Sequence, residues 1–454
     1  MVDAVWTPTV SQRDTLEFHV LTPQSDADGS IALRYAIRAS DGSGTLGLTE
    51  RITLPGDAVE NVDQDVFDHL VRLLALAAAT SYYKAVIPPK VIVDWPLTPR
   101  EKRFAEDLFR YGLAEFAYRN DVPEALRPEV VAPVAEEKPV AAADSGDPSR
   151  LLVAVGGGKD SIVSIETLRR LPVDITLFSV NEYAPIRATA DQAGLELAVA
   201  TRKLDPALFE LNRAGALNGH VPVTAINSLI GLLTAVRSGY DGVVFSNESS
   251  SSSGNVEWEG IDVNHQWSKG IEFETSLREL VGDGAPAYFS LLRPLTELAI
   301  SRRFAELRQY HSVFTSCNRA FHLDPEKRRL WCGDCPKCRF VFLILAPFMS
   351  RHELLEVFSG RDLLADESQR EGFLELLNVG GRLKPFECVG EVGECRAAVS
   401  MLRSIPGWVG HSFFDDPSVA AVADVSESEV AELLAFRSPH FVPPAFLDAL
   451  REIR

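Results

Sequence analysis

A glycine-rich loop, GGGKDS, occupies residues 156–161, directly after the apolar run LLVAV. A loop of this kind between a strand and a helix offers an anion its backbone N–H groups and the positive end of a helix dipole. Lys159 adds a positive charge and Ser161 a hydroxyl donor. The candidate phosphate site therefore consists of Gly156, Gly157, Gly158, Lys159, Asp160 and Ser161.

Two common nucleotide-binding loops do not fit these residues. A Walker loop requires glycine at position 153 and Ser or Thr at 160, where this chain has Val153 and Asp160. A dinucleotide fingerprint requires a third glycine at position 161, which is Ser161. The ordinary alternative is a structural turn with a surface lysine. The position between a strand and a helix favours the phosphate site.

The loop resembles the SGGxDS motif of the ATP pyrophosphatase (PP-loop) superfamily, with Gly156 in place of the first serine. The resemblance implies that the loop holds the pyrophosphate leaving group of ATP while an oxygen of the substrate is adenylated. It also implies a doubly wound parallel sheet as the fold of the ATP-binding domain.

Four of the six cysteines are closely spaced: Cys317, Cys332, Cys335 and Cys338. Two CxxC steps share Cys335, and four thiolates suit a structural Zn²⁺ ion. A similar arrangement follows the PP-loop domain in 7-cyano-7-deazaguanine synthases. Free cytosolic thiols, or a redox or sulfur-carrying pair as in tRNA thiolation enzymes, are the alternatives. Zinc is the favoured interpretation.

Other candidate residues carry weaker signals. Asn247 and Glu248 end an apolar strand and are candidate ATP or Mg²⁺ contacts, although such a pair is as often a helix cap. Arg293 is a candidate clamp for a carboxylate or phosphate. His265 and Lys269 are four residues apart and are candidate acids or bases, although a lone histidine more often only donates or accepts a hydrogen bond. Cys388 lies in the unusual stretch GGRLKPFECVGEVGEC, for which a surface loop is the ordinary interpretation.

The elements around these residues predict an α/β protein in four parts. Residues 1–127 combine three short β-rich runs, expected to form a small antiparallel sheet, with two amphipathic helices at 65–85 and 98–120. Residues 128–149 are rich in Pro, Ala and charge and read as a linker. Residues 150–345 alternate strands and helices, which predicts a parallel sheet with ligands at the strands' carboxyl ends. Residues 346–454 are mixed helix and loop.

The composition of the chain argues against nucleic-acid binding and against a membrane span. The chain has 454 residues and a formal charge of −19, without a run of Lys and Arg that would bind nucleic acid. The longest apolar run, 340–349, is about half of the roughly 20 residues that span a membrane. The N-terminus has no signal-peptide pattern, so a cytoplasmic enzyme acting on a small molecule is expected.

Taken together, five stretches resemble the UDP-N-acetylmuramoyl-L-alanyl-L-glutamate epimerases, MurL: SYYKA, VAVGGGKDS, FSNESSSS, CGDCPKCRFVFLILAPF and KPFECVGE. The resemblance implies inversion of the terminal L-Glu of a nucleotide-linked muramoyl dipeptide, with ATP cleaved to AMP and pyrophosphate, for peptidoglycan synthesis. Cys388, Lys269 and His265 are then the candidate proton carriers, in that order. Another adenylating enzyme, such as an amide ligase or tRNA thiolase, and a nucleotide-binding module without turnover are the rivals.

Overall fold

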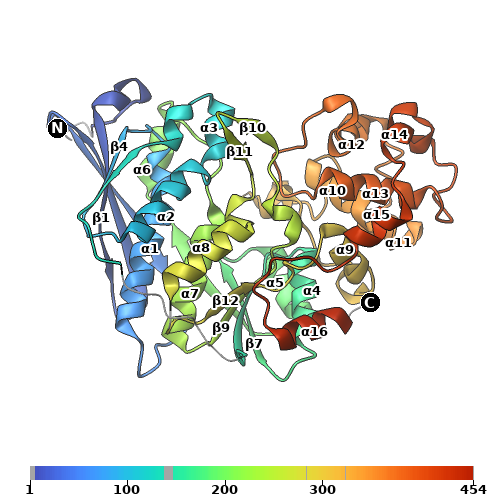
Figure 1. Ribbon diagram of the computed structural model, residues 1–454, viewed down its shortest axis with the longest axis horizontal. Coiled ribbons are helices and arrows are strands. Elements are labelled where there is room, and N and C mark those ends of the chain that lie inside the picture. The colour runs from blue at the N-terminus through green and yellow to red at the C-terminus, as the bar shows by residue number, and fades with distance from the viewer. Residues whose placement is uncertain (1–5, 138–146, 283, 323, 453–454) are drawn as a thin grey trace. The chain divides into compact units, whose positions relative to one another are not determined.

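The computed structural model describes residues 6–137, 147–282, 284–322 and 324–452 (Figure 1). Its contacts divide the chain into two compact units. Unit 1 comprises Met1–Pro148, Ala198–Val243 and Val256–Tyr288, and unit 2 comprises Ser149–Leu197, Val244–Asn255 and Phe289–Arg454. The predicted α/β class is confirmed, because strands and helices alternate along much of the chain. Within the predicted linker, residues 138–146 lie outside the described residues, whereas Glu129–Val131 forms strand β5.

Unit 1 is built on a mixed sheet. The antiparallel pairing predicted for its first three strands is confirmed, with β1 (Leu16–Ser25) next to β2 (Ser30–Ala39) and β2 next to β3 (Thr45–Thr53). Three further strands were not predicted. The strands β4 (Lys90–Val93) and β5 continue the sheet in parallel from β1, and β8 (Leu197–Lys203) pairs antiparallel with β3.

Helix α1 (Gln64–Tyr83) covers this sheet because its apolar residues recur at helical spacing and are buried. It packs on β1 and β2 and on helices α2 and α7 (Figure 1). The other helices and strands of unit 1 are α2 (Pro99–Arg110), α3 (Ala114–Asn120), α6 (Pro206–Arg213), α7 (Val223–Ser238), β10 (Val256–Trp258), β11 (Ile261–Val263) and α8 (Ile271–Val281).

The single helix predicted for residues 98–120 is wrong, because the chain breaks between α2 and α3. Gly112 lies at the break. A Cβ atom there would meet the Leu108 carbonyl oxygen at 2.4 Å and the Pro222 ring at 2.9 Å. The break therefore reflects packing against a distant segment, which the local helical pattern does not contain.

In unit 2, the strands β6 (Arg150–Ala154) and β7 (Asp174–Val180) pair in parallel. Two further strands, β9 (Gly242–Phe245) and β12 (Ala287–Ser290), continue the sheet beyond β6, so that the order is β12-β9-β6-β7. The division into units falls within the strands β9 and β12. Helix α4 (Lys159–Leu168) follows β6, α5 (Ala184–Ala193) follows β7, and α9 (Glu297–Ala305) packs on α4.

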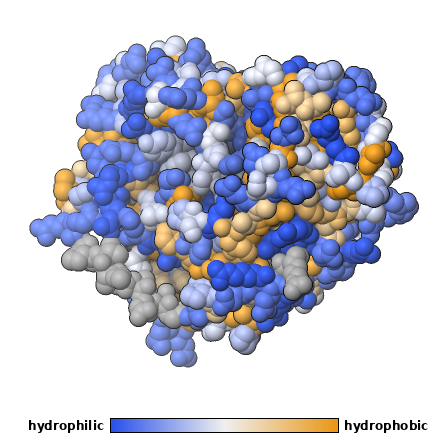
Figure 2. Space-filling model, turned by 45° about the vertical axis from the view of Figure 1, so that its right-hand side comes forward, coloured by the Kyte–Doolittle hydropathy of each residue, from blue (hydrophilic) through white to orange (hydrophobic). Residues whose placement is uncertain are grey.

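The rest of unit 2 is helix and loop, as predicted for residues 346–454. Its helices are α10 (Pro336–Leu345), α11 (Arg351–Val357), α12 (Arg370–Leu376), α13 (Val392–Leu402), α14 (Pro417–Val422), α15 (Glu427–Leu433) and α16 (Pro444–Glu452). These helices share one apolar core with α4 and α9. Within the residues described, no helix has both the length and the apolar composition to cross a membrane. Figure 2 shows hydrophilic residues interspersed with hydrophobic ones on the face that it presents.

Candidate functional site

The glycine-rich loop joins β6 to α4 at the carboxyl end of the strand, as the sequence predicts. Gly157 has a φ of 82°, a conformation that glycine adopts readily, and Gly158 is the N-cap of α4. The Thr315 backbone N–H donates to the Gly157 carbonyl oxygen at 2.9 Å. The Ser161 hydroxyl donates to the Gly158 carbonyl oxygen at 3.0 Å. The loop therefore has a fixed conformation at the N-terminus of a helix.

Lys159 is the most unusual side chain of this loop, because it is only 2% exposed. Its ammonium group donates to the carboxylates of Asp160 and Glu297. Burial alone would lower the pKa of Lys159, but these two carboxylates raise it and the net shift is upward. Burial raises the pKa of Glu297 well above its usual value. Lys159 opposes this shift, and the carboxylates of Asp160, Glu248 and Glu394 add to it. The structure thus pairs the loop lysine with acidic groups that a phosphate would replace or join.

The segment after β9 is held next to this loop by polar contacts within unit 2. Ser246 shares a 2.7 Å hydrogen bond with Ser164 of α4. The Asn247 amide donates to the Ser290 hydroxyl at 3.0 Å. The Arg293 guanidinium, 2% exposed, donates to the Glu248 carbonyl oxygen at 2.7 Å and to the Ser251 hydroxyl at 2.9 Å. Arg293 therefore fixes the backbone of the segment that carries Asn247 and Glu248.

The stretch that contains Cys388 is bonded to the same segment. The Asn255 amide donates to the carbonyl oxygens of Lys384 and Pro385 at 3.2 and 3.1 Å, and the Ser253 hydroxyl donates to Glu391. Cys388 itself is partly exposed. The structure therefore ties the loop carrying Cys388 to the segment that follows β9.

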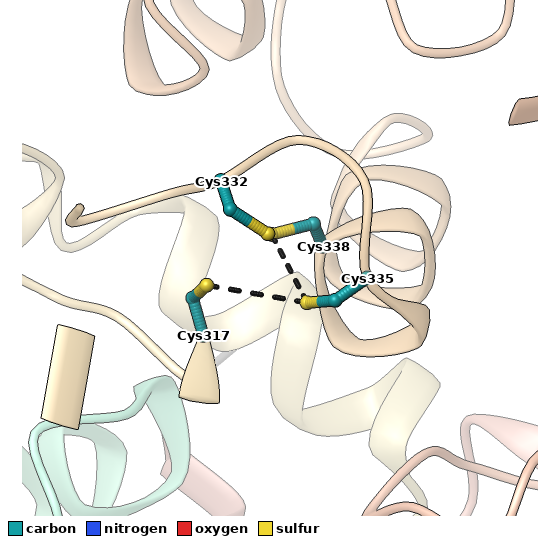
Figure 3. Close-up of side chains that lie close together, drawn as sticks. All are labelled: Cys317, Cys332, Cys335 and Cys338. Atoms are coloured by element: carbon teal, nitrogen blue, oxygen red, sulfur yellow. Dashed lines mark hydrogen bonds between the residues drawn. The ribbon is translucent and has the colours of Figure 1, made fainter. Parts of the chain in front are cut away.

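The four predicted cysteine ligands converge in unit 2 (Figure 3). The Sγ–Sγ distances are 3.5 Å for Cys335–Cys338, 3.6 Å for Cys332–Cys338 and 4.0 Å for Cys317–Cys335. A tetrahedron with Zn–S bonds of about 2.3 Å has edges of about 3.8 Å. The four thiols therefore fit a tetrahedral Zn²⁺ ion.

Thr315 links the cysteine cluster to the glycine-rich loop. Its N–H donates to Gly157, and its hydroxyl accepts from the Cys317 N–H at 3.0 Å. The next residue, Ser316, lies close to Gly158, since a Cβ atom on that glycine would be 3.0 Å from the Ser316 hydroxyl. A metal held by Cys317 would stabilise the segment against which the loop packs.

His265 and Lys269 lie in unit 1, whereas the loop and Cys388 lie in unit 2. The Lys269 ammonium donates to the Gln266 side chain at 3.3 Å. The His265 ring contacts the Glu115 carboxylate, and the centroid of its ring is 4.4 Å from that of His220. His265 therefore belongs to a polar cluster of unit 1 with Glu115 and His220, and Lys269 follows it four residues further along the chain.

Sequence reasoning missed Glu297, Glu394, Glu115 and His220. Glu297 follows the N-cap Thr296 in α9, which reads as an ordinary acidic first turn. Glu115 interrupts an apolar run at the start of α3, between Ala114 and Phe116, and a charged residue inside an apolar run is the signal that the sequence offers. Glu394 lies in the unusual stretch GGRLKPFECVGEVGEC, which is a local indication, whereas the sequence contains none for His220.

The family model described as the MurL N-terminal domain matches residues 9–291, and that of the MurL C-terminal domain matches residues 313–433. This chain belongs to the MurL family. The N-terminal MurL match contains the glycine-rich loop, Asn247, His265 and Lys269, and the C-terminal match contains the four clustered cysteines and Cys388. Arg293 and Glu297 lie between the two matched regions.

Three curated MurL relatives match nearly the whole chain, and each is named UDP-N-acetyl-alpha-D-muramoyl-L-alanyl-L-glutamate epimerase. The relative from a Micromonospora species is 45% identical over 437 residues, which is 94% of this chain and 95% of that protein. The Salinispora tropica relative is 46% identical, covering 93% and 92%. The Xanthomonas oryzae relative is 42% identical, covering 92% and 96%. No solved structure matches this chain.

Proposed function

We propose that this chain is an ATP-dependent epimerase that converts UDP-N-acetylmuramoyl-L-alanyl-L-glutamate to the D-glutamate epimer, for peptidoglycan synthesis. The observation that carries the proposal is the identity of 42–46% to three relatives so named, over more than nine-tenths of each chain. The proposed compartment is the cytoplasm, and the proposed partner is this small-molecule substrate rather than nucleic acid or membrane.

The energetic reason for using ATP lies in the charge of the substrate. Removing the α-proton next to an ionised carboxylate places a second negative charge beside the first. An acyl-adenylate has lost the carboxylate charge, and its carbonyl accepts the electrons of the developing carbanion. The α-proton then becomes accessible to an ordinary side-chain base. Return of a proton to the opposite face inverts the carbon, and water releases AMP.

The glycine-rich loop is the proposed site for the pyrophosphate of ATP. Its supports are the N-terminus of α4 and the buried Lys159. The carboxylates of Asp160 and Glu248 are of the kind that bind Mg²⁺ together with phosphates. Mg²⁺ would supply positive charge for the leaving pyrophosphate. Lys159 would exchange its contact with Asp160 or Glu297 for a phosphate oxygen. Asn247 and Arg293 remain candidate nucleotide-binding residues, with Arg293 positioning the segment after β9.

Cys388, Lys269 and His265 remain the candidate proton carriers, in that order. Cys388 leads because its loop is bonded to the segment beside the phosphate site. His265 comes last because its ring is held by Glu115 and faces His220. For Cys317, Cys332, Cys335 and Cys338 we propose a structural Zn²⁺ ion. Its role would be to hold the segment around Thr315.

The test follows pyrophosphate release and α-proton exchange together. The full chain is incubated in D₂O with ATP and Mg²⁺, with and without UDP-N-acetylmuramoyl-L-alanyl-L-glutamate. Substrate-dependent pyrophosphate and deuterium at the glutamate α-carbon are expected. The Cys388→Ala variant should lose at least about 100-fold in deuterium incorporation, in the range of a lost acid or base. The Cys395→Ala variant, which changes a buried cysteine of the core, is the matched control.

Two results would overturn the proposal. Pyrophosphate without deuterium would indicate adenylation without inversion, as in an amide ligase or tRNA thiolase. Bound ATP with neither product would indicate a nucleotide-binding module.

A further inference from the structure

Three polar side chains from distant parts of the chain meet in unit 1, and we call them the Glu115 cluster: Glu115, His220 and His265. Glu115 lies in α3, His220 precedes α7, and His265 follows β11. Each offers one ligand atom, and these atoms all lie within 4.8 Å of one another. Glu115 is 4% exposed, and the two histidines are partly exposed. The cluster is therefore anchored in the protein on one side and accessible on the other.

One carboxylate oxygen is shared by both histidines. The His265 Nδ1 contacts Glu115 Oε2, and the His220 Nδ1 is 3.7 Å from the same oxygen. The other oxygen, Oε1, accepts a 2.6 Å hydrogen bond from Arg119 Nε. A tetrahedral metal ion with bonds of about 2.1 Å separates its ligand atoms by about 3.4 Å. Small side-chain rotations would therefore bring all three donors into a first coordination shell, with Arg119 orienting the carboxylate from behind.

The same groups fit poorly as a pair of bases for inversion. Two bases that act on opposite faces of a carbon must have that carbon between them. The ring centroids of His220 and His265 are only 4.4 Å apart, which leaves no room for a substrate carbon between the rings. Convergence on a single point is instead what a metal ion requires of its ligands.

The donor types of the cluster also suit a metal. Two imidazoles and one carboxylate form a ligand set used by Zn²⁺ and by other divalent transition metals.

We propose that Glu115, His220 and His265 bind one divalent transition-metal ion, separate from the four-cysteine site. Three protein donors leave at least one coordination position for water or for an anionic group of a ligand. The neighbouring cations Arg119 and Lys269 would favour an anion there. In this assignment His265 is a metal ligand rather than a proton carrier.

The test uses Co²⁺ added to the full chain after its four-cysteine site has been filled with Zn²⁺. One saturable equivalent is expected, with visible d–d absorption and without the near-ultraviolet charge-transfer band that thiolate ligands produce. The His220→Ala and His265→Ala variants should each bind Co²⁺ at least about tenfold more weakly, in the range of a lost ligand contact. The His69→Ala variant is the matched control, because His69 contacts Glu101 at 3.3 Å in the same unit but lies outside the cluster.

A second measurement uses only the wild-type chain, so its result does not depend on whether the histidine variants fold. In the NMR spectrum of the Co²⁺-loaded wild-type chain, two strongly shifted signals that disappear in D₂O are expected, one from each ligated imidazole N–H. Absence of a saturable equivalent in the wild type would overturn the proposal. So would Co²⁺ binding that persists unchanged in the two histidine variants, or shifted signals that are absent from the wild type.

Discussion

Lys159 and Lys84 are both buried lysines, but their surroundings shift their pKa values in opposite directions. Lys159 contacts two carboxylates, which raise its pKa. Lys84 is 4% exposed and donates to the neutral amide of Asn218, and within the described residues it has no carboxylate in salt-bridge contact. Desolvation lowers the pKa of Lys84 to about 8. The two residues therefore predict different responses to mutation.

Replacing Lys159 by Met should abolish substrate-dependent pyrophosphate release and also destabilise the fold. Removing one partner of a buried ion pair typically costs about 3–5 kcal/mol, because the other charge stays buried. The free energy of unfolding is measured by urea denaturation. The double variant Lys159→Met/Glu297→Gln should regain much of this stability without regaining activity. Recovery of pyrophosphate release in the double variant would contradict the assigned role of Lys159.

Replacing Lys84 by Met should stabilise the chain at neutral pH and have less effect at pH 10. Below pH 8 the folded chain carries the full cost of a buried ammonium group, about 3 kcal/mol for a pKa lowered from 10.5 to about 8. Between pH 8 and 10.5 only the unfolded chain keeps that proton, so wild-type stability rises with pH. The Asn218 oxygen still accepts from Gly219 N–H at 3.0 Å in the variant. A gap between the two proteins that is equal at pH 7 and pH 10 would refute this explanation.

At the residue scale, the sequence alone predicted the loop but not its partner. GGGKDS is a contiguous motif whose chemistry follows from its own residues. Glu297 contacts Lys159 across 138 residues of sequence, and only the packing of α9 on α4 brings them together. For the same reason the sequence indicated His265 but not Glu115 and His220, which come from other segments of unit 1.

At the scale of elements, the turn before α4 contains two glycines, Gly156 and Gly157, that differ in how well they would accept a side chain. Gly157→Ala should reduce ATP binding and cost about 1 kcal/mol or more, because a non-glycine residue is strained at a φ of 82° and its Cβ would meet Pro185 at 3.2 Å. Gly156→Ala is the matched control for stability, since its Cβ would have nothing within 4 Å. Calorimetric titration with ATP measures binding, and thermal unfolding measures stability. Equal unfolding of the two variants would show that the turn conformation at Gly157 is not required for stability.

The four-cysteine site leads to a second prediction at this scale, which concerns bound zinc and thermal stability. Cys335→Ser should lose the bound zinc and lower the melting temperature, because structural zinc contributes directly to folding energy. Cys388→Ser is a matched control, since that cysteine lies outside the cluster. Metal content by mass spectrometry and calorimetric unfolding provide the measurements. Full zinc content in Cys335→Ser would exclude this residue as a ligand.

Elements that depend only on neighbouring residues could be predicted from the sequence, whereas features that depend on distant segments could not. β1, β2 and β3 are separated by short turn sequences, so their antiparallel pairing could be predicted from neighbouring residues. The break between α2 and α3 could not, since Gly112 packs against Pro222, far along the chain. The strand β8 was missed because its partner β3 lies in a distant segment.

At the scale of the whole molecule, each unit is assembled from interleaved segments of the chain. A fragment of residues 1–137 lacks β8, which pairs with β3, and α7, which packs on α1. We expect this fragment to show no cooperative thermal transition by circular dichroism. In the matched control, the full chain carries a protease site within residues 138–146 and is cut after it has folded. The two pieces should then elute together as one species. A cooperative transition in the isolated fragment would contradict the expectation.

The pairing of β8 with β3 also has a consequence for synthesis on the ribosome. β3 ends at Thr53, whereas β8 begins at Leu197. At about 5–20 residues per second, roughly 150 residues of synthesis leave the outer edge of β3 without this partner for about 7 to 30 s. An unpaired strand edge is a template for aggregation. The nascent chain is therefore expected to need a chaperone most during this interval.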